Sequence, residues 1–286
     1  MTIDPLFSHL LEIASHPASE GVILGGGYGI RVKQVYLREQ GARTAISTFP
    51  LARATQDLDL FLQMALFLQA ERGKALRMLL DQLNYQELTP KWQFSKPFDA
   101  AQPDIKVRVD LLSRTPSATE KIRVRHPRVG VGTGINLHSY NTPEAFAVED
   151  APLRIPISGV LPNGSQVEAN ILVPHPYASL NMKLKAAHDW LRRERGEMEE
   201  KKNSERHVFD LYLLIAMMTE AELEEAAGLA TRYSSLLVAR EICENAKELF
   251  GDKDAQGVVG MQRQLKDEIN YSLFWEALSR SLRIQH

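Results

Sequence analysis

Short apolar runs and amphipathic stretches follow one another through the first 174 residues. The apolar run Val22-Ile23-Leu24 ends at three glycines, and helical spacing of apolar positions predicts a helix from Tyr28 to about Arg38. Residues 40–52 are expected to form a loop or hairpin. Alternating or apolar segments predict strands at 57–62, 85–94, 105–112, 121–129, 154–161 and 166–173, with a helix at 64–83 and a first helix opening at Asp4-Pro5. Asn163-Gly164 predicts a hairpin turn between the last two strands.

Beyond Pro174 the pattern becomes helical. Helices are expected at 177–195, 204–218, 220–232, 235–250 and 261–283. Strands followed by helices predict an α+β fold, with a mixed sheet and flanking helices first and a C-terminal helical bundle second. We therefore expect a domain of residues 1–174 and a helical domain of residues 175–286 packed on it.

Composition narrows the class of protein. Of 286 residues, 44% are hydrophobic and 24% charged, as in soluble globular proteins, and the net charge of −2 excludes a globally basic nucleic-acid coater. The single cysteine, Cys243, excludes an internal disulfide framework and suits a reducing cytoplasm. No apolar run approaches the roughly 18 residues of a membrane span, and the start lacks the basic region of a signal peptide. A cytoplasmic protein without a membrane partner is expected.

Three aspartates lie on two of the predicted strands. Residues i and i+2 of a strand share a face, so Asp57 and Asp59 project together while the leucines between and after them face the core. Asp110 ends the alternating run 105–110. If the two strands are neighbours, three carboxylates converge, and they would repel one another unless cations bind. The pattern predicts a site for two Mg²⁺ ions, which prefer carboxylate, water and phosphate oxygens.

The glycine turn suits the same chemistry. Without Cβ atoms, Gly25-Gly26-Gly27 lets the backbone approach phosphate oxygens, and the helix that follows adds a favourable dipole. Taken singly, an Asp-x-Asp strand is more often solvated surface and a glycine turn more often structural. Their order along the chain, with Arg53-x-Thr55 before the first Asp, favours a nucleoside triphosphate site. A dinucleotide site is disfavoured because Ile30 stands where its pattern needs Gly or Ala.

These residues resemble the DNA polymerase β-type nucleotidyltransferase superfamily, and in particular the AbiEii/AbiGii toxin family, which includes the MenT toxins. The family pattern of an apolar strand, Gly-Gly, a helix and Arg-x-Thr/Ser-x-Asp-Leu-Asp appears here as Gly26-Gly27 and Arg53-Ala54-Thr55-Gln56-Asp57-Leu58-Asp59. A second signature appears as Met182-Lys183-Leu184-Lys185-Ala186 and Arg206-His207-Val208-Phe209-Asp210-Leu211-Tyr212. The resemblance covers about residues 20–215. Residues 38–52 look like an insertion, and Tyr28 replaces a small or hydroxyl residue.

The resemblance implies roles for individual residues. Gly26 and Gly27, with Thr55, would seat the triphosphate, and Lys183 would contact it. Asp57 and Asp59 would bind both metals. Asp110 would bind the catalytic metal and accept the proton of the attacking hydroxyl. Asp210 would help hold the helix pair or the active site.

The function that the resemblance implies is Mg²⁺-dependent transfer of a nucleotide from an NTP to a hydroxyl of RNA, such as a tRNA 3′ end, or of a protein. The protein would be the toxin of a bacterial toxin–antitoxin or phage-defence pair, neutralised by a separately encoded antitoxin. Two alternatives stay open. One is transfer of the terminal phosphate to a protein at the same site, and the other is a non-catalytic nucleotide- or RNA-binding module.

Basic residues outside these motifs have two interpretations. Lys121, Arg123 and Arg125 fall on one face of the expected strand 121–129, which is either an ordinary exposed strand or a basic edge that grips RNA or triphosphate. A second basic group could extend that patch: Lys185, Arg192, Arg193 and Arg195. Arg114 could also meet a phosphate. For Lys185 with Asp189 and Arg193, a solvated ladder of ion pairs is the preferred interpretation.

Overall fold

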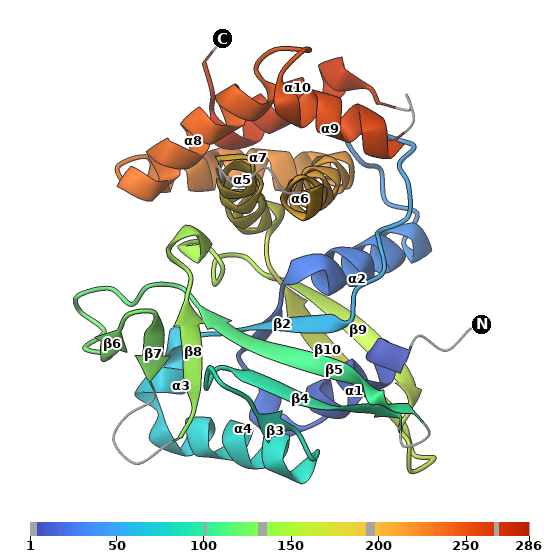
Figure 1. Cartoon of the computed structure of the whole chain (residues 1–286), viewed down its shortest axis with the longest axis vertical. Helices are drawn as coiled ribbons and strands as arrows, with labels where there is room; N and C mark the ends of the chain where they lie inside the picture. The colour runs from blue at the N-terminus through green and yellow to red at the C-terminus, as the bar shows by residue number, and fades with distance from the viewer. Residues whose placement is uncertain (1–4, 100–101, 131–135, 193–197, 266–268, 286) are drawn as a thin grey trace. The chain divides into compact units, whose positions relative to one another are not determined.

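The computed structural model describes residues 5–99, 102–130, 136–192, 198–265 and 269–285 (Figure 1). It divides into two compact units. The sheet unit consists of Met1–Gly29 and Ala54–Pro174, and the helical unit of Ile30–Arg53 and His175–His286. The predicted helix start at Asp4, and the basic residues Arg193 and Arg195, lie outside the described residues.

All described strands belong to one ten-stranded sheet in the sheet unit, with the order β6-β7-β8-β5-β2-β1-β10-β9 and with β3 and β4 on a branch through β5. Their bounds are β1 Val22–Leu24, β2 Asp57–Leu62, β3 Gln86–Glu87, β4 Gln93–Asp99, β5 Gln102–Ser113, β6 Val124–Arg125, β7 Arg128–Gly130, β8 His138–Asn141, β9 Leu153–Val160 and β10 Gln166–Val173. The predicted α+β fold is confirmed.

The centre of the sheet is mixed. β1 pairs parallel with β10 and antiparallel with β2, and β2 pairs parallel with β5. The predicted hairpin of β9 and β10 is present, with Gly164 at φ +85° in its turn. Because β2 and β5 are hydrogen-bonded neighbours, the strands that carry the three aspartates lie side by side, which is the condition for their carboxylates to converge.

One face of these two strands is core. Leu58 and Leu60 of β2, and Val107, Val109 and Leu111 of β5, are fully buried. The residues between them alternate to the other face, where Asp57 and Arg108 are exposed and Asp59 and Asp110 are half-buried. Period-2 alternation therefore places the aspartates on the open face of a sheet whose opposite face is packed.

Helices of the sheet unit are short. α1 (Pro5–Ala14) packs on β9 and β10, and α4 (Ala70–Gln82) packs on the 3-10 turn η1 (Pro17–Ser19). A second 3-10 turn, η2, spans Pro143–Ala145. The single helix expected at 64–83 is wrong. α3 (Met64–Leu68) ends at Gln69, whose extended backbone, φ −109° and ψ 93°, separates it from α4.

Two expected strands are also interrupted by prolines. The segment 85–94 splits into β3 and the start of β4, around a turn that contains Pro90, and 121–129 splits into β6 and β7 around His126-Pro127. Proline has no N–H to give to a ladder, so a strand that contains it tends to end there. Strand β8 was not expected from the sequence.

The helical unit contains α5 (Pro176–Arg192), α6 (Met198–Ala216), α7 (Glu220–Tyr233), α8 (Leu237–Phe250), α9 (Gln256–Leu265) and α10 (Tyr271–Leu282). α5 packs on α6, α7 and α8, and α6 on α9 and α10. The single helix expected at 261–283 is two helices. Asn270 caps the second, since its side chain accepts the N–H of Leu273 at 3.2 Å.

Helix α2 (Gly26–Glu39) begins in the sheet unit, and from Ile30 the chain belongs to the helical unit as far as Arg53. Lys33 of α2, 2% exposed, forms an ion pair of 2.6 Å with Glu222 at the start of α7. The loop after α2 is held by backbone hydrogen bonds from Ala45 to Met218 and from Ile46 to Ala216. The segment that resembled an insertion is thus part of the helical unit's own packing.

Candidate functional site

The glycine turn closes directly over Asp59. Gly26 adopts φ +62°, and a Cβ added to it would lie 1.7 Å from Oδ2 of Asp59, so only glycine fits. The N–H of Gly25 donates to the carbonyl of Asp59 at 2.8 Å, which ties the turn to β2. The first N–H groups of α2 therefore start beside an aspartate, and such groups have no acceptor within their own helix.

The parallel register of β2 and β5 sets the carboxylates in order. Asp59 is the cross-strand partner of Asp110, and Asp57 is the partner of Arg108. Cross-strand partners share a face and stand about 5 Å apart. Asp59 and Asp110 are therefore adjacent like charges, whereas Asp57 lies beside a guanidinium at the exposed start of β2.

Asp110 is the most perturbed of these groups. Burial, with the repulsion of Asp59 and then Asp57, raises its pKa to about 6, although Arg108 and a hydrogen bond from Gln93 act against that rise. Its Oδ1 is buried without a hydrogen-bond partner among the described residues. A buried carboxylate oxygen without a donor, next to a second carboxylate, is the environment that a cation would relieve.

These residues fit a magnesium ion as a pair. Within the described ranges, no group of three or more His, Cys, Asp or Glu side chains is arranged to hold a metal. Mg²⁺ in nucleotide enzymes usually takes one or two carboxylates and completes its shell with water and phosphate oxygens. Asp59 and Asp110 meet that need, and the role of Asp57 as a metal ligand stays a prediction.

The helical unit holds a second charged cluster. Asp210 of α6, whose side chain is 2% exposed, accepts two hydrogen bonds from Arg53, each 3.0 Å, and one of 2.7 Å from Lys183 of α5. Burial alone would raise the pKa of Asp210, but Lys183 and Arg53 outweigh it and hold the pKa below its ordinary value. One carboxylate faces two cations, so the cluster carries excess positive charge.

The pKa of His207, which lies beside this cluster, is lowered. Burial is the largest cause and Lys183 the next, and together they lower the pKa of His207 to about 3. The imidazole therefore stays neutral beside the cluster at physiological pH. Sequence reasoning gave Arg53 no role of its own, although the Arg-x-Thr of the motif was a signal that pointed to it.

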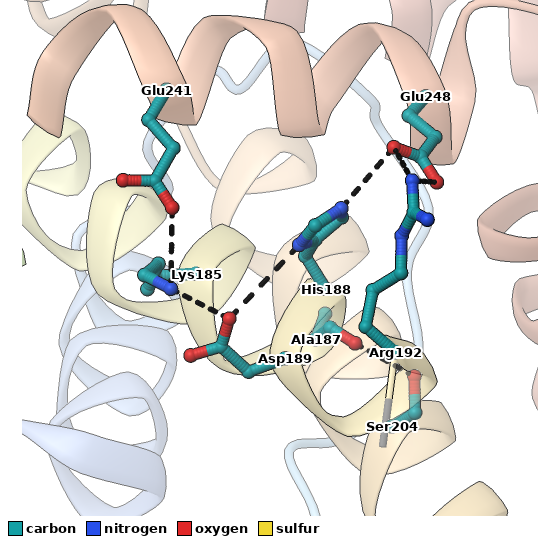
Figure 2. A network of polar contacts seen from close by, with 8 residues as sticks. All are labelled: Lys185, Ala187, His188, Asp189, Arg192, Ser204, Glu241 and Glu248. Atoms are coloured by element: carbon teal, nitrogen blue, oxygen red, sulfur yellow. Dashed lines mark hydrogen bonds and ion pairs between the residues drawn. The ribbon is translucent and has the colours of Figure 1, made fainter. Parts of the chain in front are cut away.

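Two other predicted basic features are neutralised in the structure. Figure 2 shows Lys185 joined to Asp189 and Glu241, and Arg192 joined to Glu248, which also accepts from His188. The expected ion pair of Lys185 with Asp189 is confirmed at 2.6 Å, and the extension of a free basic patch along α5 is wrong for Lys185 and Arg192.

Arg114 is likewise engaged, because it pairs with Glu120 and with Glu149. These two ion pairs compensate the charge of Arg114, so the structure does not support a contact between Arg114 and a phosphate. Thr55 lies two residues before Asp57, whose N–H donates to the Thr55 hydroxyl at 3.4 Å. The turn residues Gly26 and Gly27, Thr55 and the three aspartates belong to the sheet unit, and Lys183 and Asp210 to the helical unit.

Comparison with known proteins identifies a family for this chain. The model of the family described as nucleotidyl transferase AbiEii toxin, type IV TA system, matches residues 44–278 and so begins beyond the glycine turn. No curated protein and no solved structure matches the chain. None of the described helices has the length and apolar character needed to cross a membrane. The match spans most of the sequence, and the chain therefore belongs to the AbiEii nucleotidyl transferase toxin family of type IV toxin–antitoxin systems.

Proposed function

We propose that this protein is a Mg²⁺-dependent nucleotidyltransferase that moves a nucleotide from an NTP to a hydroxyl of RNA. The observation that carries the proposal is the turn at Gly26, closed over Asp59 where that residue pairs with Asp110. Backbone N–H groups that can donate to phosphate oxygens then lie next to carboxylates that can bind a cation, on one open face of the sheet. Family membership supports the nucleotidyl transfer, and the metal and the acceptor are our proposal.

Asp59 and Asp110 would hold Mg²⁺, with Asp57 contributing from the exposed start of β2. When bound there, Mg²⁺ supplies charge neutralisation for the triphosphate and lowers the pKa of the attacking hydroxyl. In the absence of metal, burial and the neighbouring Asp59 and Asp57 raise the pKa of Asp110 to about 6. We assign to this carboxylate the acceptance of the hydroxyl proton. The hydroxyl oxygen bonds to the α-phosphorus as the bond to the pyrophosphate oxygen breaks.

The remaining charge of the triphosphate needs donors. Backbone N–H groups at Gly26 and Gly27 open α2, where the helix dipole favours anions, and the Thr55 hydroxyl precedes Asp57 by two residues. In the helical unit, Lys183 is the residue that the family resemblance assigns to the triphosphate. Its ammonium is held by Asp210, which makes Asp210 a positioning residue.

The acceptor that we favour is single-stranded RNA such as a tRNA 3′ end. The open face around the carboxylates also carries the exposed cations Lys106 and Arg108, which suit a polyanion. The family description names a toxin of a toxin–antitoxin system, so we propose that a separately encoded antitoxin neutralises the activity, and that the toxin acts in the cytoplasm, where NTPs and tRNA meet.

The decisive test is incubation of the purified protein with total tRNA, Mg²⁺ and each α-³²P-labelled NTP. Label on RNA that disappears in Asp59→Asn and Asp110→Asn, and persists in Asp104→Asn, would support the proposal. Asp104 is a matched control because it is an exposed aspartate of the same strand, six residues before Asp110. Transfer of γ-label to a protein would instead identify phosphoryl transfer, and binding of NTP without any transfer would identify a binding module.

A further inference from the structure

A single row of side chains crosses the open face of the sheet beside Asp110. The register pairs Leu112 of β5 with Tyr140 of β8, Tyr140 with Arg128 of β7, and Arg128 with Arg125 of β6. Cross-strand partners share a face, and Leu112 shares its face with Asp110 two residues earlier. Figure 1 shows β8, β7 and β6 leading away from β5 in this order. The row therefore starts next to the candidate catalytic carboxylate and ends at the edge of the sheet.

Tyr140, the second residue of the row, is exposed and lies against the half-buried Trp92. The rings of Trp92 and Tyr140 lie 5.5 Å apart between centroids at an interplanar angle of 52°, and Tyr140 is 38% exposed. Trp92 is fixed by its carbonyl, which accepts the N–H of Leu111 at 2.8 Å. Exposed aromatic side chains held in place are stacking platforms for unpaired bases.

The row continues as a cluster of arginines. Arg123 and Arg125 are exposed and Arg128 is half-buried, and among the described residues no carboxylate forms an ion pair with any of them. Arg128 lies close enough to His138 to help burial lower the pKa of that imidazole. These arginines thus differ from Arg114 and Arg192, whose charges are already compensated, and they offer positive charge to an anion.

We propose that Trp92, Tyr140, Arg125 and Arg128, which we call the β6–β8 platform, bind a single-stranded stretch of the RNA acceptor, with a base on the aromatic pair and phosphates on the arginines. The proposal rests on the proposed function, because it names where that acceptor lies. Strands stand about 4.8 Å apart, so Arg125 is about 14 Å from β5. An aromatic surface followed by arginines on two further strands suits a nucleic-acid strand, in which bases and phosphates alternate along its length. Paired bases in a duplex would not reach the rings.

The test is fluorescence anisotropy of a labelled 12-nucleotide single-stranded RNA with the full chain, without NTP, at several salt concentrations. Tyr140→Ala should weaken binding about 5-fold or more through lost stacking, and Tyr140→Phe should bind like the wild type. The double variant Arg125→Ala/Arg128→Ala should lower the slope of log affinity against log salt by about 1.4. Arg154→Ala is the matched control, since Arg154 is exposed on β9 of the same unit, and it should change nothing.

The inference would be overturned if Tyr140→Ala and the double arginine variant bound RNA like the wild type, or if poly-glutamate or duplex RNA displaced the strand as well as unlabelled single-stranded RNA. Circular dichroism spectra and NTP binding would serve as the controls for the folding of each variant. The two proposals fail separately. Binding that the variants lose, with no nucleotide transfer by the wild type, supports the platform and overturns the transfer. Transfer to RNA that the variants retain supports the transfer and overturns the platform.

Discussion

Replacing Asp210 by Asn would test the charged cluster of the helical unit. The substitution keeps the shape of the side chain but replaces one acceptor oxygen with an NH₂ donor. That donor would face Arg53 or Lys183, which are donors themselves. Two cations would then share a buried position without a carboxylate.

The loss of stability expected for Asp210→Asn follows from how deeply the three charged groups are buried. Removing one partner of a buried ion pair costs about 3–5 kcal/mol. Asp210 itself is buried, but Arg53 is 31% and Lys183 13% exposed, so both cations can recover part of their hydration. The lower end, about 3 kcal/mol, is therefore expected, which corresponds to a fall in the melting temperature of about 6–12 °C for a chain of this size.

Urea unfolding followed by far-UV circular dichroism measures this loss, with exposed Asp254→Asn as the control in the same unit. The pKa of Asp210 is lowered in the folded state, so its contribution is complete above the ordinary value of 3.8 and is lost as pH falls below it. The gap between wild type and variant should be constant from pH 7 to 5 and shrink near pH 3.5. Equal midpoints at pH 7, or a gap that widens in acid, would refute the reasoning.

Three further predictions follow from the same geometry. Gly26→Ala should reduce nucleotide transfer at least about 100-fold, because the added Cβ would overlap the carboxylate of Asp59. Gly41→Ala is the control, since Gly41 also has a positive φ but lies in open space. It should lower the free energy of unfolding in urea by only about 1 kcal/mol through backbone strain and leave nucleotide transfer intact. Asp110→Asn should stabilise the metal-free protein at pH 7 by up to about 3 kcal/mol, because the raised pKa of Asp110 makes its ionised form unfavourable in the folded state. Thermal melts measure this gain, which should vanish at pH 4, where Asp110 is protonated. A gain that persists at pH 4 would contradict the raised pKa. Lys33→Met should lower the melting temperature much less than Glu222→Ala, because only the latter leaves a buried ammonium unpaired, and the reverse order would count against this buried pair.

The sequence determined the parts of this protein that depend on local periodicity. Period-2 alternation placed Asp57 and Asp59 on one face of a strand, and the structure has that strand at the residues expected. Glycines after an apolar run predicted the turn, and apolar positions at helical spacing predicted the helices after residue 174. These features follow from contacts within a few residues, so no knowledge of distant partners was needed.

Only the tertiary structure decided which distant residues meet. Asp210 binds Arg53, 157 residues earlier in the chain, and no local pattern encodes that choice of partner. The pairing of β5 with β8, which brings Tyr140 beside Leu112, joins residues that lie 28 positions apart in the sequence. Residues 30–53 likewise belong to the helical unit because of long-range packing, although they precede most of the sheet in the sequence. Local periodicity specifies the face that a side chain occupies, whereas burial and hydrogen bonding across the whole chain select its neighbours.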